Sequence, residues 1–376
     1  MIQANPHGVR HLYVHLPFCA HRCGYCDFVT LVGKREGHGA YVDGLLAELE
    51  LERDILAEGV QTVFLGGGTP TFTEPRELAR LLEALPWAAE VTVEANPETV
   101  TPQLASLLRE CGVTRVSLGA QSFDPRLLAV LERRAGPDDV RRAFYHLRDA
   151  CFDNISLDLI YGIPGQSPSD LERDLEAALA LEPEHLSCYE LEAKPGTRFV
   201  HDWGAELVRQ AESMEGYFEQ VVETLVAAGY RWYETANFCR EERRARHNMA
   251  YWLGRDYLGL GIGAVSTVGD LRWRNAPKLA PYLAALASGL RPPRELEQLD
   301  GQTRVVERLM LGLRLDRPVP LAEVAGAVEP GALDRLERLG LVERTDGSLG
   351  LTRRGRFLGG GVTAELIAET PAKNYN

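Results

Sequence analysis

Short apolar runs alternate with longer amphipathic stretches through the first two thirds of the chain. The short runs, several of them rich in β-branched residues, predict strands at residues 11–15, 61–65, 90–95, 115–120, 155–161 and 185–190. The longer stretches have apolar residues at helical spacing and predict helices at residues 41–57, 77–85, 102–110, 125–134, 138–150 and 169–181. Alternating β and α elements form a parallel sheet with right-handed crossovers. A closed eight-unit barrel typically takes about 250 residues, so six units in roughly 190 residues predict an α/β fold with an incomplete (β/α)6 barrel.

The pattern changes after the sixth unit. Residues 214–228 predict a further helix and residues 230–235 a further strand, while the glycine-rich segment 254–269 suits a close-packed loop beside a ligand or plain turns. Pro292 and Pro293 predict a linker, because consecutive prolines break helices and sheets alike. Beyond them the pattern predicts helices at residues 302–315, 321–328 and 331–339 and a hairpin at residues 341–343 and 348–351. We therefore expect a first domain over residues 1–290 and a small winged-helix-like domain over residues 294–376.

Composition narrows the class of protein. Hydrophobic residues at 45% and charged residues at 25% are ordinary for a folded soluble chain. The net charge of −13 argues against binding to nucleic acid or to anionic membranes, which needs a basic surface. From Arg291 onward 13 basic residues meet 13 acidic ones, so the winged-helix-like unit favours a structural or protein-contact role over DNA binding. The sequence contains no run of about 20 apolar residues and no signal peptide, so we expect a cytoplasmic protein without a transmembrane segment.

Cys19, Cys23 and Cys26 stand in the spacing C-x3-C-x2-C. Thiolate sulfur is the preferred ligand of iron–sulfur clusters, so three thiols in one loop can ligate three irons of a cubane and leave the fourth open to a small molecule. The alternative is a structural zinc site, which takes four closed ligands and which His15 and His21 would have to complete. Seven cysteines with one such cluster fit a reducing compartment better than a disulfide framework. The remaining cysteines are expected to be buried small side chains: Cys111, Cys151, Cys188 and Cys239.

Polar residues follow the expected strands where a parallel barrel has its functional face. A glycine turn, Gly66-Gly67-Gly68-Thr69, follows the second strand, and its main chain can approach a ligand closely because glycine has no side chain. The later strands end at Glu94, Gln121, Asp158, Tyr189 and Glu190.

With Tyr25 directly before the third cysteine, the loop resembles the signature of radical S-adenosylmethionine proteins. The resemblance implies a [4Fe–4S] cluster on Cys19, Cys23 and Cys26, whose open iron is chelated by the methionyl group of S-adenosylmethionine. In that family the reduced cluster passes an electron to the sulfonium and a 5′-deoxyadenosyl radical results. The methionyl end would lie against Gly67, Gly68 and Thr69.

The resemblance extends over nearly the whole chain to one branch of the family, which contains oxygen-independent coproporphyrinogen III dehydrogenase and a related heme chaperone. The motifs that carry it are YVHLPFC from Tyr13, GGGTPT, EANP, GAQSF, DLIYG and GLG at residues 259–261. For this chain the branch implies S-adenosylmethionine contacts from Tyr13, Tyr25, Gly67, Gly68, Thr69, Glu94, Gln121, Arg133 and Asp158. Two alternatives stay open, namely that Arg133 is a solvated helix residue and that Tyr13 belongs to the core.

Two features favour the chaperone over the dehydrogenase. The dehydrogenase pattern has a further cysteine where this chain has Phe28, and a longer segment before the cysteine loop. In addition His247-Asn248-Met249-Ala250-Tyr251-Trp252 resembles the H-N-x-x-Y-W motif of the heme chaperone, in which the histidine takes part in heme binding. Imidazole is a standard axial ligand of heme iron. The nearby Arg243, Arg244 and Arg246 would meet heme propionates, although a solvated charge run leading into a core aromatic pair is the alternative.

The resemblance thus implies a heme chaperone with a heme-binding extension on the barrel domain. Its implied cofactors are a [4Fe–4S] cluster, S-adenosylmethionine and heme. Its implied partners are an electron donor for the cluster and heme-acceptor proteins such as respiratory enzymes. The alternatives are oxidative decarboxylation of coproporphyrinogen III propionates and radical methyl transfer with two cofactor molecules. Whether radical chemistry takes place, and whether the chain forms a homodimer, stays open.

Overall fold

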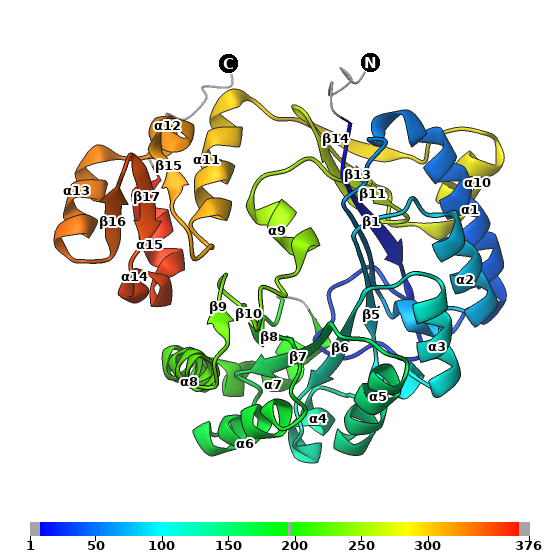
Figure 1. The fold of residues 1–376 in the computed structure, drawn as a ribbon, viewed down its shortest axis with the longest axis horizontal. Coiled ribbons are helices and arrows are strands. Elements are labelled where there is room, and N and C mark those ends of the chain that lie inside the picture. Colours follow the sequence, from blue (N-terminus) through cyan, green and yellow to red (C-terminus); the bar gives the residue numbers. More distant parts are fainter. Residues whose placement is uncertain (1–7, 195–196, 368–376) are drawn as a thin grey trace.

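The computed structural model describes residues 8–194 and 197–367, and its centre is a mostly parallel nine-stranded sheet (Figure 1). The strand order is β11-β1-β4-β5-β6-β7-β8-β10-β9. All six predicted strands are present and parallel, which confirms the incomplete barrel: β1 (His11–Leu16), β4 (Thr62–Gly67), β5 (Glu90–Ala95), β6 (Arg115–Gln121), β7 (Ile155–Tyr161) and β8 (His185–Glu190).

The two edges of the barrel carry shorter strands. β10 (Asn237–Cys239) runs antiparallel to β8, and β9 (Arg231–Trp232) pairs with β10. β11 (Leu258–Leu260) lies parallel to β1, so the expectation of a loop or turns over residues 254–269 was wrong for this part. A side chain on the central residue, Gly259, would overlap the carbonyl group of Val265, so glycine here permits close packing rather than a turn.

Helices cover the outer face of the sheet (Figure 1). They are α1 (His38–Leu51), α2 (Pro75–Ala84), α3 (Pro102–Glu110), α4 (Pro125–Val130), α5 (Pro137–Asp149) and α6 (Pro168–Leu179), followed by α7 (Arg198–Gln210) and α8 (Met214–Ala227). The side chains of Thr101 and Ser167 cap α3 and α6, and a proline occupies the first turn of each. The helix predicted at residues 125–134 ends early, because Glu132 takes a positive φ of 56°.

The two faces of the sheet differ in chemistry. Residues that point toward the helices, such as Val63, Val93 and Leu157, are buried in the main apolar core. The alternate residues, which point into the barrel, are largely polar: Thr62, Glu90, Thr92, Glu94, Arg115, Ser117, Ser156, Asp158, His185 and Ser187. The barrel interior therefore holds a polar network instead of a second apolar core.

A short helix, α9 (Arg246–Trp252), closes the amino-terminal end of this interior. The Glu90 carboxylate accepts the backbone N–H groups of Arg246 and His247, each at 3.0 Å, and so caps the start of α9. The His247 side chain reaches Thr62 at the beginning of β4. These contacts attach α9 to the starts of β4 and β5.

A small antiparallel sheet extends the first domain. It consists of β12 (Val265–Val268), β13 (Leu271–Asn275) and β14 (Arg294–Gln298), with α10 (Leu279–Ala287) between the last two. Arg294 binds Glu48 of α1 at 3.5 Å and Glu52, directly after α1, at 2.6 Å, and both carboxylates are fully buried. The division between residues 290 and 294 remains a prediction, and these contacts attach β14 to the first of the two parts.

The winged-helix-like unit expected near the end of the chain is present. It contains α11 (Gly301–Gly312), α12 (Leu321–Val324), α13 (Pro330–Arg338), α14 (Arg353–Phe357) and α15 (Gly359–Leu366), with strands β15 (Val319–Pro320), β16 (Val342–Thr345) and β17 (Ser348–Leu351). Leu309, Val324, Leu336 and Leu349 belong to a separate buried cluster of this unit. Within residues 8–194 and 197–367, none of the helices combines the length and the apolar character that crossing a bilayer requires.

The network around Arg294 yields a stability prediction. Arg294→Ala should lower the free energy of unfolding by about 3–5 kcal/mol, because it leaves the buried Glu48 carboxylate without its cation and removes one of the two cations that bind Glu52. Arg291 contacts the same Glu52 carboxylate at 2.8 Å, but its side chain is 54% exposed. Arg291→Ala is therefore the matched control and should cost less than about 1 kcal/mol. Urea unfolding followed by circular dichroism measures both, and equal losses would contradict this account of the network.

Candidate cofactor site

The cysteine loop is held at both ends by a pair of two-residue strands. β2 (Phe18–Cys19) pairs in parallel with β3 (Leu31–Val32), and the N–H of Cys26 donates to the carbonyl of Cys23 at 3.2 Å. All seven cysteines have free thiols. The Thr69 hydroxyl donates to Cys19 Sγ at 3.6 Å, and Arg133 Nη1 donates to Cys23 Sγ at 3.7 Å. Thr69, which follows β4, and Arg133, which follows α4, therefore contact the thiols directly.

The glycine turn lies against this loop. Gly67 has a positive φ of 111°, and a side chain there would overlap the His15 ring. A Cβ on Gly68 would lie 2.6 Å from the Pro17 carbonyl carbon and oxygen, just before Cys19. Glycine is thus required for the strand end to approach the cysteine strand, besides exposing the backbone to a ligand. It follows that Gly68→Val would disturb the cysteine loop itself.

One cavity of about 780 Å³ brings most of the predicted site together. It lies at the carboxyl ends of the strands, where the sequence places the functional face. Eleven of the thirteen predicted site residues line it: Cys19, Cys23, Cys26, Tyr25, Gly67, Gly68, Thr69, Glu94, Gln121, Arg133 and Asp158. Tyr189 and Glu190 at the end of β8 line it as well.

Two carboxyl groups, from β5 and β7 on either side of β6, set the electrostatics of this cavity. Burial, reinforced by the charge of Asp158, raises the pKa of Glu94 to about 7, although the Gly67 N–H donates to its Oε2 at 3.1 Å. Burial also raises the pKa of Asp158, which accepts hydrogen bonds from Ser117 at 3.0 and 3.1 Å. A ligand that brings a positive charge or a hydroxyl group would therefore stabilise the ionised form of both carboxyl groups.

Arg133 is not a solvated helix residue. It lies beyond the end of α4, where its Nη2 donates at 2.9 Å to both the Asn96 side chain and the Gly119 carbonyl. Its Nε is buried without a partner among the described residues. Asn96 in turn donates to the Thr69 hydroxyl at 2.9 Å. Asn96 therefore joins the glycine turn to Arg133, a role that the sequence analysis did not assign.

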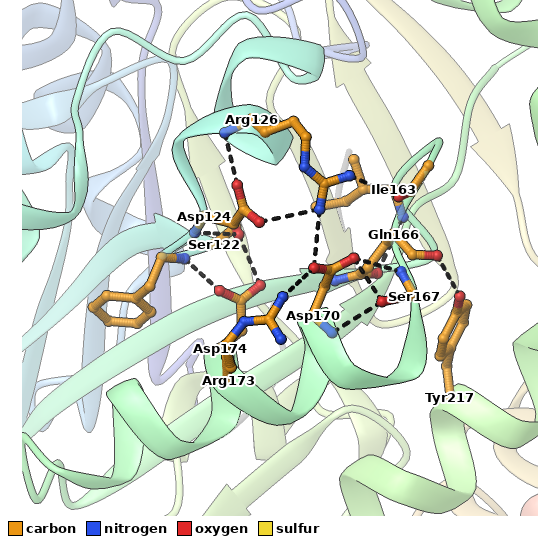
Figure 2. Close-up of polar contacts among 12 residues, drawn as sticks. Ser122, Asp124, Arg126, Ile163, Gln166, Ser167, Asp170, Arg173, Asp174 and Tyr217 are labelled. Carbon is orange, nitrogen blue, oxygen red and sulfur yellow. Dashed lines mark hydrogen bonds and ion pairs between the residues drawn. The ribbon is translucent and has the colours of Figure 1, made fainter.

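Gln121 belongs to a tight turn whose next residue, Ser122, binds Asp174 of the helix α6 (Figure 2). It has a positive φ of 64° and follows an irregularity in the pairing of β6 with β7. The next two residues bind the Asp174 carboxylate of α6. The Ser122 hydroxyl donates to it at 2.7 Å and the Phe123 N–H at 2.6 Å. A side chain outside the cavity thus fixes the backbone that carries Gln121 into it.

A second carboxylate of α6, that of Asp170, connects the loop between β7 and α6 to α4, as Figure 2 shows. Asp170 accepts hydrogen bonds from the Ser167 N–H at 2.8 Å and from its hydroxyl at 2.7 Å, and it pairs with Arg126 at 2.9 Å. Burial alone would raise the pKa of Asp170, but these contacts outweigh it and lower the pKa to about 2. Asp174 has no cationic partner among the residues that the structure describes, and burial raises its pKa to about 6.

Tyr13 and His247 lie outside this cavity. The Tyr13 hydroxyl binds His15 Nδ1 at 3.1 Å, and its ring stacks on Phe64. The fully buried His247 uses both ring nitrogens: Nδ1 binds the Thr62 hydroxyl and Nε2 binds the Tyr251 hydroxyl, each at 2.8 Å. Burial lowers the pKa of His247 to about 3, so the imidazole is neutral.

The isolated cysteines are only partly buried as predicted, and His15 is not available for the alternative zinc site. Cys188 and Cys239 are buried as expected, but Cys151 is exposed and Cys111 is half-buried, so the expectation was wrong for these two. His15 donates or accepts through both ring nitrogens, to Tyr13 and to the Val29 carbonyl, which leaves it no free nitrogen for zinc. In the part of the chain that the structure describes, no three His, Cys, Asp or Glu side chains are grouped to hold a single ion.

The residues fit a cluster and S-adenosylmethionine in three respects. Three unpaired thiols and an open glycine backbone share one cavity. Carboxyl groups stand opposite them on β5 and β7. The buried Arg133 side chain keeps one unsatisfied N–H beside the thiols. Sulfur ligands, carboxylates and a spare guanidinium donor are the groups that a cluster and an amino-acid-bearing sulfonium require.

Some lining residues escaped the sequence analysis. Arg115 and Ser187 belong to strands that were recognised, and only their alternation with apolar neighbours would have indicated that they face the interior. Asn248 and Arg314 come from α9 and from the end of α11, far along the chain. No local pattern relates them to the cysteine loop.

Comparison with known proteins gives a consistent result. Residues 13–178 match the radical SAM superfamily, and residues 299–358 match the HemN C-terminal domain. A protein of Mycobacterium tuberculosis named heme chaperone HemW is 38% identical over 96% of this chain and 95% of its own length. The protein of that name in Bacillus subtilis is 32% identical over 95% of this chain and 99% of its own length. The solved coproporphyrinogen III oxidase (HemN) of Escherichia coli, a radical SAM enzyme, superposes with a TM-score of 0.82 at 22% identity, covering 96% and 91% of the two chains.

Glu94 gives a pH-dependent prediction. If its carboxylate binds the expected cofactor, affinity for S-adenosylmethionine should rise with pH through about 7. Below that pH the raised pKa leaves Glu94 protonated and uncharged in most molecules. Glu94→Gln should weaken binding by about 10- to 100-fold at pH 8, the effect of one lost charge-assisted hydrogen bond, and should flatten the pH profile. Equilibrium dialysis measures both quantities. Glu110→Gln, at the exposed end of α3, is the control, and an unchanged profile in Glu94→Gln would refute the assignment.

Asp174 gives a second prediction about positioning. Asp174→Ala should lower the free energy of unfolding by about 2–4 kcal/mol, because it leaves the buried groups of Ser122 and Phe123 unpaired. It should also weaken S-adenosylmethionine binding, although Asp174 does not line the cavity. Arg173→Ala, on the same helix with a side chain 61% exposed, should do neither.

The pH dependence of stability supplies an independent check on Asp174. Its pKa is raised above the usual 3.8 to about 6, so the native state binds a proton that the unfolded chain releases between these values. The contribution of this group to stability is therefore present below about pH 4 and is lost as the pH rises to about 6. Asp174→Asn should remove that slope from urea unfolding measured at several pH values. A slope that persists in the variant would show that Asp174 is not its source.

Proposed function

Because the chain belongs to the HemW family of the radical SAM superfamily, we propose that it is a heme chaperone that binds a [4Fe–4S] cluster, S-adenosylmethionine and heme and passes heme to acceptor proteins. The observation that carries the proposal is the 38% identity, over nearly the full length of both chains, to a protein named for that activity. The cofactor cavity supports it independently.

In this proposal Cys19, Cys23 and Cys26 hold three irons of the cluster. The glycine turn binds the methionyl end of S-adenosylmethionine through its backbone, while Glu94 and Asp158 bind the cofactor's amino or hydroxyl groups. Cluster and cofactor together supply a one-electron source and a latent adenosyl radical. The chain's own residues orient the cofactor and keep it in a partly enclosed cavity.

The proposal does not require that a substrate radical forms. Phe28 stands where the dehydrogenase pattern has a further cysteine, and its side chain is 59% exposed at the rim of the cofactor cavity. A cysteine of that pattern is thus replaced by an apolar ring. This favours the chaperone over the decarboxylating enzyme, while the likeness to the solved oxidase concerns the fold alone.

His247 as an axial ligand of heme stays a prediction. Its neutral imidazole is the form that coordinates iron. In the structure, however, Nε2 is taken by the Tyr251 hydroxyl at 2.8 Å, so coordination requires that this hydrogen bond opens. The charge run at residues 240–246 is also engaged in part, since Arg243 pairs with Asp153 at 3.0 Å and Arg244 with Glu242 at 3.1 Å.

The direct test is anaerobic reconstitution with heme and coproporphyrinogen III offered in parallel. We expect four irons and four sulfides per chain, saturable binding of about one heme seen as a Soret shift, and no protoporphyrinogen IX even with a reductant present. Cys23→Ala should abolish cluster assembly, and Cys111→Ala is the matched control. Steady conversion of coproporphyrinogen III, or full cluster loading of Cys23→Ala, would overturn the proposal.

A further inference from the structure

The cysteine loop borders a second large cavity, of about 970 Å³. Asp27 and Phe28 line both this cavity and the cofactor cavity. Its other walls come from the end of α9, from β12 and β13, and from α11 of the carboxyl-terminal unit. In Figure 1 α9 lies between α11 and the β11–β1 edge of the large sheet. We call this space the α9–α11 cavity.

Aromatic and apolar side chains line the α9–α11 cavity. Tyr251 and Trp252 of α9 face it together with Tyr257. Phe28 is 59% exposed and Met310 is 47% exposed, so two large apolar side chains stay open to solvent at one place. Exposed apolar groups that gather in a concave site indicate a ligand or partner rather than a packing role. Aromatic faces in particular suit a flat conjugated ligand.

The charges of the cavity are opposite to those of the whole chain. Five arginines line it against three carboxylates, although the protein has a net charge of −13. Arg272 binds Glu307 at 2.6 Å and Arg308 binds Glu323 at 2.8 Å, while Arg304 donates to the Gly269 carbonyl.

The two remaining arginines differ from these three. Arg255 and Arg274 form no ion pair or hydrogen bond through their guanidinium groups with any residue in the described ranges 8–194 and 197–367. They come from different elements, Arg255 from the segment after α9 and Arg274 from β13, yet both line the same cavity. The cavity thus offers two unpaired cations beside an aromatic wall. A flat apolar ligand with two carboxylates satisfies both features.

We infer that the α9–α11 cavity is where this chain binds heme, with the two propionates on Arg255 and Arg274. The inference rests on the proposed function and adds the location. Two spare guanidiniums match the two carboxylates of heme, whereas coproporphyrinogen III has four. The volume lies within the range of about 300–1,000 Å³ that small-molecule sites have.

The location also explains how the H-N-x-x-Y-W residues relate to heme. Tyr251 and Trp252 form part of the cavity wall, and the Tyr251 hydroxyl stands 2.8 Å from His247 Nε2. Heme in this cavity would therefore lie beside the motif with Tyr251 between it and the imidazole. Met310 on α11 offers a thioether, the other common neutral ligand of heme iron.

The test compares two pairs of arginines and two forms of heme. The Arg255→Ala/Arg274→Ala double variant removes the unpaired cations, and Arg141→Ala/Arg142→Ala, two exposed arginines of α5 that line neither cavity, is the control of equal charge. Each protein, as the full chain with its reconstituted cluster, is titrated with hemin and with hemin dimethyl ester, whose propionates are uncharged. Both targeted side chains are exposed, so their removal should leave the fold intact.

We expect the Arg255/Arg274 variant to bind hemin at least tenfold more weakly than wild type, because each arginine removed takes away a charge-assisted hydrogen bond to a propionate. The affinity of the control variant should stay within about twofold of wild type. The dimethyl ester should bind wild type weakly and should not distinguish the variants. If wild type binds hemin and the Arg255/Arg274 variant binds it equally well, or the control pair loses as much, this location is wrong while the chaperone proposal stands. Failure of wild type to bind hemin would overturn both.

Discussion

The polar inner face of the parallel sheet is the constraint on which the rest of the structure depends. Parallel sheets covered on both sides usually have apolar residues on both faces. Here alternate positions put groups such as Arg115, Asp158 and His185 inside the barrel, where each needs a hydrogen-bond partner. At the amino-terminal end protein groups supply the partners, since His185 binds the Ser156 and Tyr233 hydroxyls at 2.8 Å. At the carboxyl end Glu94 and Asp158 face the cofactor cavity, and this is the end that the cysteine loop covers.

Closing one end of the barrel with α9 has a consequence for the proposed function. The same helix that buries His247 inside the barrel presents Tyr251 and Trp252 to the α9–α11 cavity. The cysteine loop separates this cavity from the cofactor cavity, and Asp27 and Phe28 belong to both rims. A protein arranged in this way can hold S-adenosylmethionine and heme at once, each in its own cavity. An enzyme that attacks a porphyrin must instead bring its substrate into the cofactor cavity.

The six strands, most of the helices and the gathering of most candidate site residues at the strand ends were predictable from the sequence because they depend on local patterns. β-Branched runs, helical spacing and a single cysteine motif are all short-range signals. The strand β11, the helix α9 and the position of the Arg133 side chain were not predictable in this way. β11 depends on the close approach of Gly259 to Val265, and α9 on the distant carboxylate of Glu90. The same holds for Asp174, whose partners Ser122 and Phe123 come from another unit of the barrel.

The central claim is that two ligands occupy two separate cavities on this chain. The most direct measurement is a hemin titration of cluster-loaded protein, followed in the Soret band with and without saturating S-adenosylmethionine. Separate cavities predict the same heme affinity within about twofold and one heme per chain in both titrations, since a ligand that does not share the site shifts the other's affinity only through coupling. Competition, in which S-adenosylmethionine weakens heme binding in proportion to its own concentration, would place both ligands in one cavity and would contradict the account.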